Sequence, residues 1–195
     1  MLYIVRHGET ELNSRHVLQG RSDEPLNENG VHQAETAGEW FRNRGISFET
    51  VWASPLQRAV RTAEIIAPGV PVRIDQRLIE MDYGPYEGMD LKYPAPEVMR
   101  FFRDFVHQPA PEGMEPLQKI VQRAGAFVEE CCRSGENILI STHAIAMKGI
   151  LEYLTPESGG SYWSTFVGNC GVYAAEWKDG RFEVPKELYR GSAKH

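Results

Sequence analysis

The amino-acid sequence predicts a three-layer αβα fold, in which helices cover both faces of a mostly parallel central sheet. Two observations lead to this fold class. Short apolar runs of the kind found in buried strands recur along the 195-residue chain, and segments with apolar residues every three or four positions lie between them. Chains in which strands and helices alternate build such layered sheets. We expect one domain over residues 1–195, because that length suffices for a full core.

Short apolar runs mark the strands. The predicted parallel strands are residues 2–5, 51–53, 70–74 and 137–142. Later in the chain, 172–177 and 181–184 flank Asp179 and Gly180, a pair that is typical of two-residue turns. We therefore expect a hairpin added at the edge of the parallel sheet.

Helical spacing of apolar residues appears five times. One helix begins near Glu28 with Asn27 as its N-cap, and another has Ser54 as N-cap and Pro55 in its first turn. The clearest pattern runs from 115 to 133 and ends just before a glycine. In chain order, the first predicted helix starts near residue 28, and the other four cover 54–67, 94–105, 115–133 and 144–154.

Hydropathy and charge argue against several classes of protein. The first apolar run is interrupted at Arg6, which does not suit a secretory signal, and the best later candidate for a membrane span, 144–154, is short and contains two charges. We therefore expect a cytoplasmic protein without a membrane partner. A formal net charge of -6 argues against a nucleic-acid partner, for which a clustered basic face would be needed.

The cysteines and carboxylates do not indicate a metal site. Cys131 and Cys132 are adjacent and Cys170 stands alone, which fits neither a disulfide framework nor the paired spacing of a zinc site. The acidic residues show no metal-binding spacing either. The sequence therefore predicts no metal and no other cofactor.

Basic side chains follow three of the predicted strands. Arg6 and His7 come directly after the first strand, Arg58 lies one turn into the helix after the second, and His143 follows "NILIST". The carboxyl ends of parallel strands and the amino ends of the helices meet at one edge of such a sheet. Each residue alone has an ordinary structural explanation, but a cluster of cations in an acidic chain favours an anionic ligand.

A phosphoryl group suits this cluster. The forked donors of arginine match its oxygens, and a neutral imidazole at His7 can attack phosphorus as a nucleophile. The reaction also needs an acid for the departing alkoxide and later a base for water. Glu80, within "RLIEMDYGPYEG", is the best candidate for both roles.

Five blocks of sequence, in order, resemble the motifs of the histidine phosphatase superfamily, which includes cofactor-dependent phosphoglycerate mutase. The blocks are "RHGETELN" at 6–13, "QGRSDEPLNENGVHQA" at 19–34, "SPLQRAVRTAE" at 54–64, "LIEMDYGPYEG" at 78–88 and "STHA" at 141–144. A single R-H-G would be weak support, but five blocks in the family's order are specific. The resemblance implies a phosphoglycerate mutase-like fold.

The resemblance also implies roles for individual residues. His7 would become transiently phosphorylated, Arg6, Arg58 and His143 would hold the phosphoryl oxygens, and Glu80 would donate the proton. Further residues would line the phosphate pocket or bind the substrate: Asn13, Gln19, Gly20 and Ala144. For Asn13, Gln19 and Gly20, a purely structural role as turn residues stays open.

Ala144 is the visible departure, because the family more often has glycine after the second histidine. Alanine can still offer a backbone N–H at a helix start, so we expect altered local packing and intact catalysis.

Three functions remain open. The segment at about 89–115 is where family members build a lid, and it is compact here, which favours a metal-independent phosphatase acting on a small phosphorylated metabolite. The first alternative is a cofactor-dependent phosphoglycerate mutase, and the less favoured one is a non-catalytic binding module with the same fold. A homodimer is compatible with the sequence.

Overall fold

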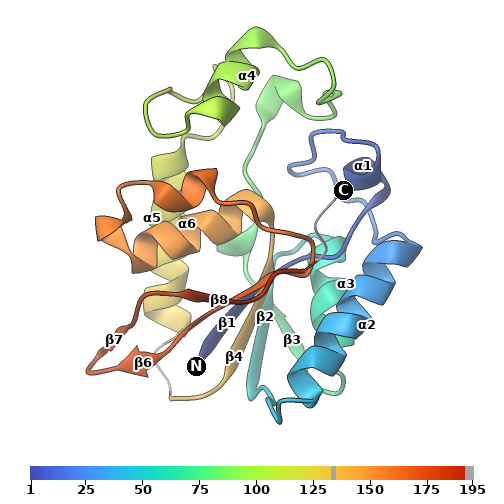
Figure 1. Cartoon of the computed structure of the whole chain (residues 1–195), viewed down its shortest axis with the longest axis vertical. Helices are drawn as coiled ribbons and strands as arrows, with labels where there is room; N and C mark the ends of the chain where they lie inside the picture. Colours follow the sequence, from blue (N-terminus) through green and yellow to red (C-terminus); the bar gives the residue numbers. More distant parts are fainter. Residues whose placement is uncertain (133–134, 192–195) are drawn as a thin grey trace.

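A six-stranded sheet forms the centre of the molecule (Figure 1). The computed structural model describes residues 1–132 and 135–191. The strand order across the sheet is β3 (Val72–Ile74), β2 (Thr50–Ala53), β4 (Ile138–Thr142), β1 (Leu2–Arg6), β5 (Val172–Ala175) and β8 (Lys186–Tyr189). The first four strands pair in parallel, and β5 and β8 pair antiparallel to their neighbours.

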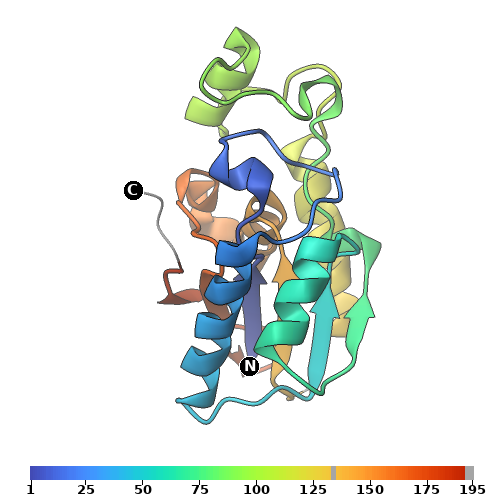
Figure 2. The same cartoon turned by 90° about the vertical axis from the view of Figure 1, so that its right-hand side faces the viewer.

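Helices cover both faces of this sheet. On one face, α2 (Glu28–Arg42) and α3 (Gln57–Ile66) bury apolar residues such as Phe41 and Ile66 in one core cluster. On the other, α5 (Leu117–Cys131) and α6 (Ala144–Leu154) contribute Phe127 and Ile150 to a second cluster. Figure 2 shows α2 and α3 in front of the strands, and Figure 1 shows α5 and α6 on the opposite side. The predicted three-layer αβα fold is therefore confirmed.

The central strands consist mostly of apolar residues because both of their faces are buried. In β1, Leu2 and Ile4 belong to the cluster under α5 and α6, whereas Tyr3 and Val5 belong to the cluster under α2 and α3. Successive side chains of a strand point to opposite faces, so a strand covered on both sides has no polar alternation. This explains why the sequence showed a continuous run.

A third apolar cluster lies beyond the carboxyl ends of the parallel strands. It joins α4 (Pro96–Arg103), at the top of Figure 1, to the rest of the molecule through Phe101, Met81, Ile145 and Trp163. The 94–105 segment is helical only over α4, which begins at a proline. The connecting segments contain short 3-10 turns and a short helix: η1 (Gln76–Leu78), η2 (Gly84–Tyr86), η3 (Pro156–Ser158), η4 (Ser161–Ser164) and α1 (Glu11–Ser14).

The predicted start of α3 is wrong. The helix begins at Gln57, its N-cap is Leu56, and neither Ser54 nor Pro55 belongs to its first turn. The Asp23 carboxylate, from a distant loop, accepts the Gln57 N–H at 2.7 Å. A carboxylate at this position satisfies a free helix N–H and interacts favourably with the helix dipole, so a local serine cap is not needed.

The predicted hairpin is also corrected. The strands β6 (Trp177–Lys178) and β7 (Arg181–Phe182) do form a two-residue hairpin through Asp179 and Gly180, both with positive φ, but this ladder is separate from the main sheet. Residues 172–175 instead form β5, which lies between β1 and β8. All four β5 residues are buried, which suits an inner strand, whereas β8 is mostly polar and exposed, as an edge strand allows.

The remaining boundaries differ by small amounts. The N-cap at Asn27 is confirmed, since its side chain accepts the Gly30 N–H. The long helix begins at Leu117, after Pro116, and the predicted end at Arg133 lies outside the described residues. Among residues 1–132 and 135–191, no helix combines the length and apolarity needed to cross a bilayer.

Candidate active site

The pairing of β1 with β4 places two histidines side by side. Arg6 is in register with Thr142, and the His7 N–H donates to the Thr142 carbonyl at 2.9 Å. His143 follows Thr142 directly, and the ring centroids of His7 and His143 lie 5.0 Å apart. The parallel strands β1 and β4 end at the same level, so they bring together residues 7 and 143, which are 136 positions apart in the sequence. The predicted juxtaposition of the two histidines is present.

The His7 ring is oriented by a backbone carbonyl. Its Nδ1 lies 2.6 Å from the Gly8 oxygen, and because a carbonyl can only accept, Nδ1 carries the proton. The lone pair is therefore on Nε2. Burial, followed by the charges of Arg58 and Arg6, holds the pKa of His7 well below its usual value. His7 is consequently a neutral imidazole at neutral pH, with an unprotonated Nε2.

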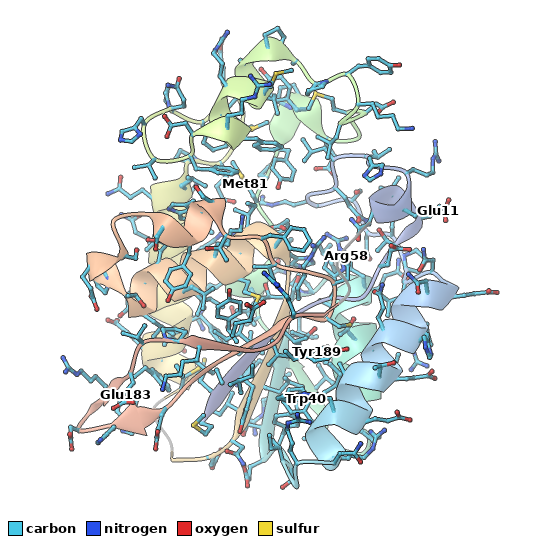
Figure 3. The ribbon with its side chains drawn as sticks, viewed as in Figure 1. Glu11, Trp40, Arg58, Met81, Glu183 and Tyr189 are labelled. Carbon is cyan, nitrogen blue, oxygen red and sulfur yellow. The ribbon has the colours of Figure 1, made fainter. Side chains whose placement is uncertain are left out.

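Arg58 reaches this site from the first turn of α3. Its side chain is fully buried, and Figure 3 shows it in the interior. It donates from Nη1 to the Ser22 carbonyl and from Nη2 to the Gly20 carbonyl, both at 2.6 Å, while Nε lies 3.3 Å from His7 Nε2. Burial lowers the pKa of Arg58 to about 10, so the guanidinium remains protonated at neutral pH. Neutral carbonyls hold this cation, which leaves its charge available to an anion.

Arg6 lies at the end of β1 and also lacks a carboxylate partner among the described residues. Its Nη1 donates to the Val167 carbonyl at 2.7 Å, and its Nε is enclosed without a hydrogen-bond partner. Burial lowers the pKa of Arg6, and the charge of Glu80 opposes that effect.

His143 is fully buried and shares a 2.7 Å hydrogen bond between its Nε2 and Ser54 Oγ. Its Nδ1 has no hydrogen-bond partner among the residues that the structure describes. Burial, with Arg58 as the next cause, holds the pKa of His143 well below its usual value. Ser54, which the sequence predicts as a helix N-cap, thus forms a hydrogen bond with the second histidine.

The Glu80 carboxylate is bound at the amino end of α6. Oε1 accepts the N–H groups of Met81 and Ala146 at 2.9 Å, and Oε2 accepts that of Ile145 at 3.2 Å. These three backbone donors fix the position of the Glu80 side chain. Ala144 is the first residue of α6 and stands next to these donors. The side chain that the sequence predicts as the acid is therefore buried and held at the start of α6, the helix that follows His143.

The loop residues Asn13, Gln19 and Gly20 lie along the same site. Thr10 Oγ1 donates to Gln19 Oε1 at 2.7 Å, and Asn13 Nδ2 lies 3.4 Å from the same oxygen. Gln19 Nε2 is buried, and within 1–132 and 135–191 it has no hydrogen-bond partner. A Cβ on Gly20 would come within 2.5 Å of the Met81 carbonyl, so only glycine fits where its own carbonyl accepts Arg58.

Sequence reasoning missed three further residues near the site. Ser54 was assigned to another role, and Asn169 had no local signal, although its buried side chain donates to the His7 carbonyl at 3.0 Å. Lys148 did have a signal, because it is a single charge within the apolar stretch "AIAMKGIL", but it was used only to argue against a membrane span.

Buried groups without partners concentrate at this site. In the described part of the chain, five buried side-chain nitrogen or oxygen atoms lack a hydrogen bond, and three of them are Arg6 Nε, Gln19 Nε2 and His143 Nδ1. Burying a polar group unpaired costs about 1–3 kcal/mol, so such a concentration indicates a ligand that completes the bonds.

A model of one protein family matches residues 2–187, and its description is the histidine phosphatase superfamily, branch 1. The chain belongs to the histidine phosphatase superfamily. Members of this superfamily transfer phosphoryl groups as phosphatases or mutases. This membership supports phosphoryl transfer as the reaction class of this chain.

Some similar proteins are named as mutases and others as phosphatases. A protein of Citrobacter koseri, named provisionally as phosphoglycerate mutase GpmB, is 30% identical, with 94% of this chain and 88% of that protein covered. An Escherichia coli structure, named provisionally as an α-ribazole-5′-phosphate phosphatase, is 26% identical with a TM-score of 0.79, covering 98% and 95% of the two chains. A phosphoglycerate mutase from Thermus thermophilus is 27% identical with a TM-score of 0.73, covering 96% and 98%.

Proposed function

We propose that this protein is a metal-independent phosphomonoesterase that acts on a small phosphorylated metabolite through a phosphohistidine at His7. The observation that carries the proposal is the concentration of unpaired buried donors beside two neutral histidines. Arg6, Arg58 and the Gln19 amide supply donors for the phosphoryl oxygens. His143 contributes a further polar atom, its unpaired Nδ1. Positive groups around the phosphoryl group stabilise the charge that develops in the transition state.

In the first half-reaction, His7 Nε2 attacks phosphorus and forms the P–N bond while the P–O bond of the ester breaks. Glu80 acts as the acid of this step and transfers a proton to the departing alkoxide. The N–H groups of Ile145 and Ala146 then stabilise the carboxylate that remains. In the second half-reaction, Glu80 accepts a proton from water, the hydroxide attacks phosphorus, and the P–N bond breaks to release inorganic phosphate.

The lid is part of this proposal. We assign residues 89–115 to a cover over the leaving group, since α4 and the apolar cluster beneath it lie beyond the strand ends that carry the histidines. A compact cover lets water reach the phosphohistidine, whereas a mutase must hold the first product until it accepts the phosphoryl group again.

A test of the phosphatase uses p-nitrophenyl phosphate in the presence of a chelator. We expect steady phosphate release, an acid-labile phosphoryl group trapped on the protein during turnover, and loss of both in His7→Ala. Persistent activity in His7→Ala would contradict the phosphohistidine mechanism. Absence of phosphate release from any of a broad set of phosphomonoesters would instead favour a non-catalytic module.

The mutase alternative is favoured by the names of the Citrobacter koseri and Thermus thermophilus relatives. It predicts that 2- and 3-phosphoglycerate interconvert and that 2,3-bisphosphoglycerate stimulates the reaction. Phosphate release without interconversion or stimulation would reject it.

A further inference from the structure

The Glu87 carboxylate binds the backbone of the loop that holds Arg58. Its Oε1 accepts the Gly20 N–H and the Ser22 hydroxyl, both at 2.8 Å. Longer contacts, both at 3.3 Å, join the same carboxylate to the N–H groups of Arg21 and Ser22. Successive backbone N–H groups that point to one side form a concavity for an anion. In this loop a side chain of the protein itself, Glu87, supplies the anion.

The same loop turns its carbonyls toward Arg58. The peptide unit that links Gly20 to Arg21 donates its N–H to Glu87 Oε2. The carbonyl oxygen of that unit accepts a hydrogen bond from Arg58 Nη2 at 2.6 Å. Ser22 likewise donates its N–H to Glu87, and its carbonyl accepts Arg58 Nη1 at 2.6 Å. Both carbonyls that hold the guanidinium therefore belong to residues whose own donors are bound by Glu87.

Glu87 supports the charge of Arg58 without pairing with it directly. None of the ion pairs within residues 1–132 and 135–191 joins these two side chains. Linked hydrogen bonds polarise one another, so a carboxylate on the N–H side of a peptide makes its carbonyl a better acceptor for a cation. Burial lowers the pKa of Arg58 to about 10, and the Glu87 charge is among those that oppose this effect. The guanidinium thus stays protonated and available to an anion.

The position of Glu87 links this loop to the proposed acid. Glu80 lies seven residues earlier in the same segment, where the amino end of α6 holds its carboxylate. Beyond Glu87, the Gly88 N–H donates to the Leu18 carbonyl at 2.9 Å, which ties the segment to the chain just before the loop. A Cβ on Gly20 would come within 2.6 Å of Glu87 Oε2, so glycine permits the close approach. One segment therefore carries the proposed acid and anchors the loop behind Arg58.

We propose that Glu87 is a positioning residue for Arg58, because its carboxylate fixes the 20–22 loop and so orients the guanidinium before a phosphoryl group binds. This inference rests on the proposed function and adds to it a residue that acts through another. An oriented donor costs little reorganisation in the transition state, whereas a donor on a loose support must be ordered in each turnover. Loss of the Glu87 carboxylate should therefore affect the reaction through Arg58.

A double-mutant cycle tests this coupling, with kcat/KM for p-nitrophenyl phosphate as the measured quantity. Glu87→Gln keeps the size of the side chain but removes its charge and turns an amide donor toward the loop N–H groups. It should lower kcat/KM about 10- to 100-fold in the wild type, as a small misplacement of a catalytic group does. In Arg58→Lys, where the planar fork is absent, the same change should cost about 2-fold or less.

The cycle distinguishes positioning from a general loss of structure. A structural role alone would lower kcat/KM by the same factor in both backgrounds, and that result would overturn the inference, as would an unchanged kcat/KM in Glu87→Gln. Glu87→Asp keeps the charge on a shorter side chain and should retain part of the activity. If Glu87→Gln does not fold, Glu87→Asp is measured in both backgrounds by the same criterion.

The matched control is Asp82→Asn. Asp82 also binds this loop, but through an ion pair at 3.0 Å with the exposed side chain of Arg21. Exposed ion pairs contribute little, so kcat/KM should stay within about 2-fold of the wild type. A loss in Asp82→Asn as large as that in Glu87→Gln would mean that any weakening of the loop lowers activity, and would reject the specific role of Glu87.

A second readout needs no turnover. In ¹⁵N NMR of the resting protein, the Arg58 Nε–H should exchange with water at least about 10-fold faster in Glu87→Gln than in the wild type or Asp82→Asn, because the support of the guanidinium is loosened. Faster exchange in a protein that releases no phosphate would retain the positioning role and reject the phosphatase. Phosphate release with unchanged exchange in Glu87→Gln would retain the phosphatase and reject the positioning role.

Discussion

Arg58 Nε lies 3.3 Å from His7 Nε2, so this buried guanidinium contacts the nitrogen proposed as the nucleophile and, after burial, is the next cause of the lowered pKa of His7. The same guanidinium is fixed by the carbonyls of Gly20 and Ser22, and therefore has little freedom to move when a phosphoryl group arrives. Donors that are already oriented cost little reorganisation in the transition state. This preorganisation makes Arg58 the first target for mutation.

Arg58→Lys should lower kcat/KM for p-nitrophenyl phosphate by about 100- to 1000-fold, the effect of removing one oriented donor. A lysine ammonium cannot reach both carbonyls and His7 with the geometry of a planar fork. Steady-state kinetics measures the loss. Arg61→Lys on the same helix is the matched control, because Arg61 is exposed and pairs with Glu64, and it should leave kcat/KM near that of the wild type.

Glu80→Gln should slow esters with poor leaving groups by about 100-fold or more, and good ones far less, because only a basic alkoxide requires protonation. The amide keeps the size of the side chain and one acceptor for the N–H groups of α6. The measurement is the dependence of kcat/KM on the pKa of the leaving alcohol. Equal slowing across the series would contradict an acid role for Glu80.

Ser54→Ala should reduce both activity and stability. Removal of the hydroxyl leaves His143 Nε2 unpaired in the interior, at a cost of about 1–3 kcal/mol in the free energy of unfolding. We expect kcat to fall as well, since the ring loses the contact that orients it. In the control, Ser141→Ala, a buried hydroxyl loses its bond to the Ala59 carbonyl, and only stability should fall. Thermal unfolding and kcat, measured together, separate the two effects; a stability loss without a kcat loss in Ser54→Ala would count against the positioning role.

Both histidines should remain neutral at pH 6.5, where an ordinary histidine is half protonated, because burial and nearby arginines lower their pKa values. Protonated histidine is disfavoured in the folded protein, so these groups reduce the free energy of unfolding as pH falls through the ordinary value of 6.5. ¹⁵N NMR of the imidazole nitrogens reports the charge directly. A half-protonated His7 at pH 6.5 would contradict the description of the nucleophile.

Lys148→Met should stabilise the fold at pH 7. The folded-state pKa of Lys148 is lowered to about 8 from 10.5, so below pH 8 the buried charge reduces stability, and this penalty fades as pH rises from 8 to 10.5. After allowance for the lost bond to Trp163, we expect a gain of about 1–2 kcal/mol in the free energy of unfolding at pH 7, measured by urea titration. A loss of stability at pH 7 would indicate that the ammonium is a structural element.

Much of the candidate site could be predicted because its residues sit at recognisable places. Arg6 ends β1, and His7 and His143 directly follow β1 and β4, two inner strands whose apolar runs are visible in the sequence. Glu80 was selected by its motif, but nothing local indicated that its carboxylate would be bound by the N–H groups of another helix, 65 residues away. The same limit applies to Asn169, which contacts His7 across 162 residues.

The sequence by itself determined the strand and helix pattern, the family and the identity of the main polar residues at the strand ends, since periodicity and motifs are local properties. Only the tertiary structure decided which partner each polar group takes: Asp23 at the start of α3, Ser54 on His143, and the Trp163 carbonyl on Lys148. The physical reason is that a buried hydrogen bond joins groups brought close by packing, whatever their separation along the chain.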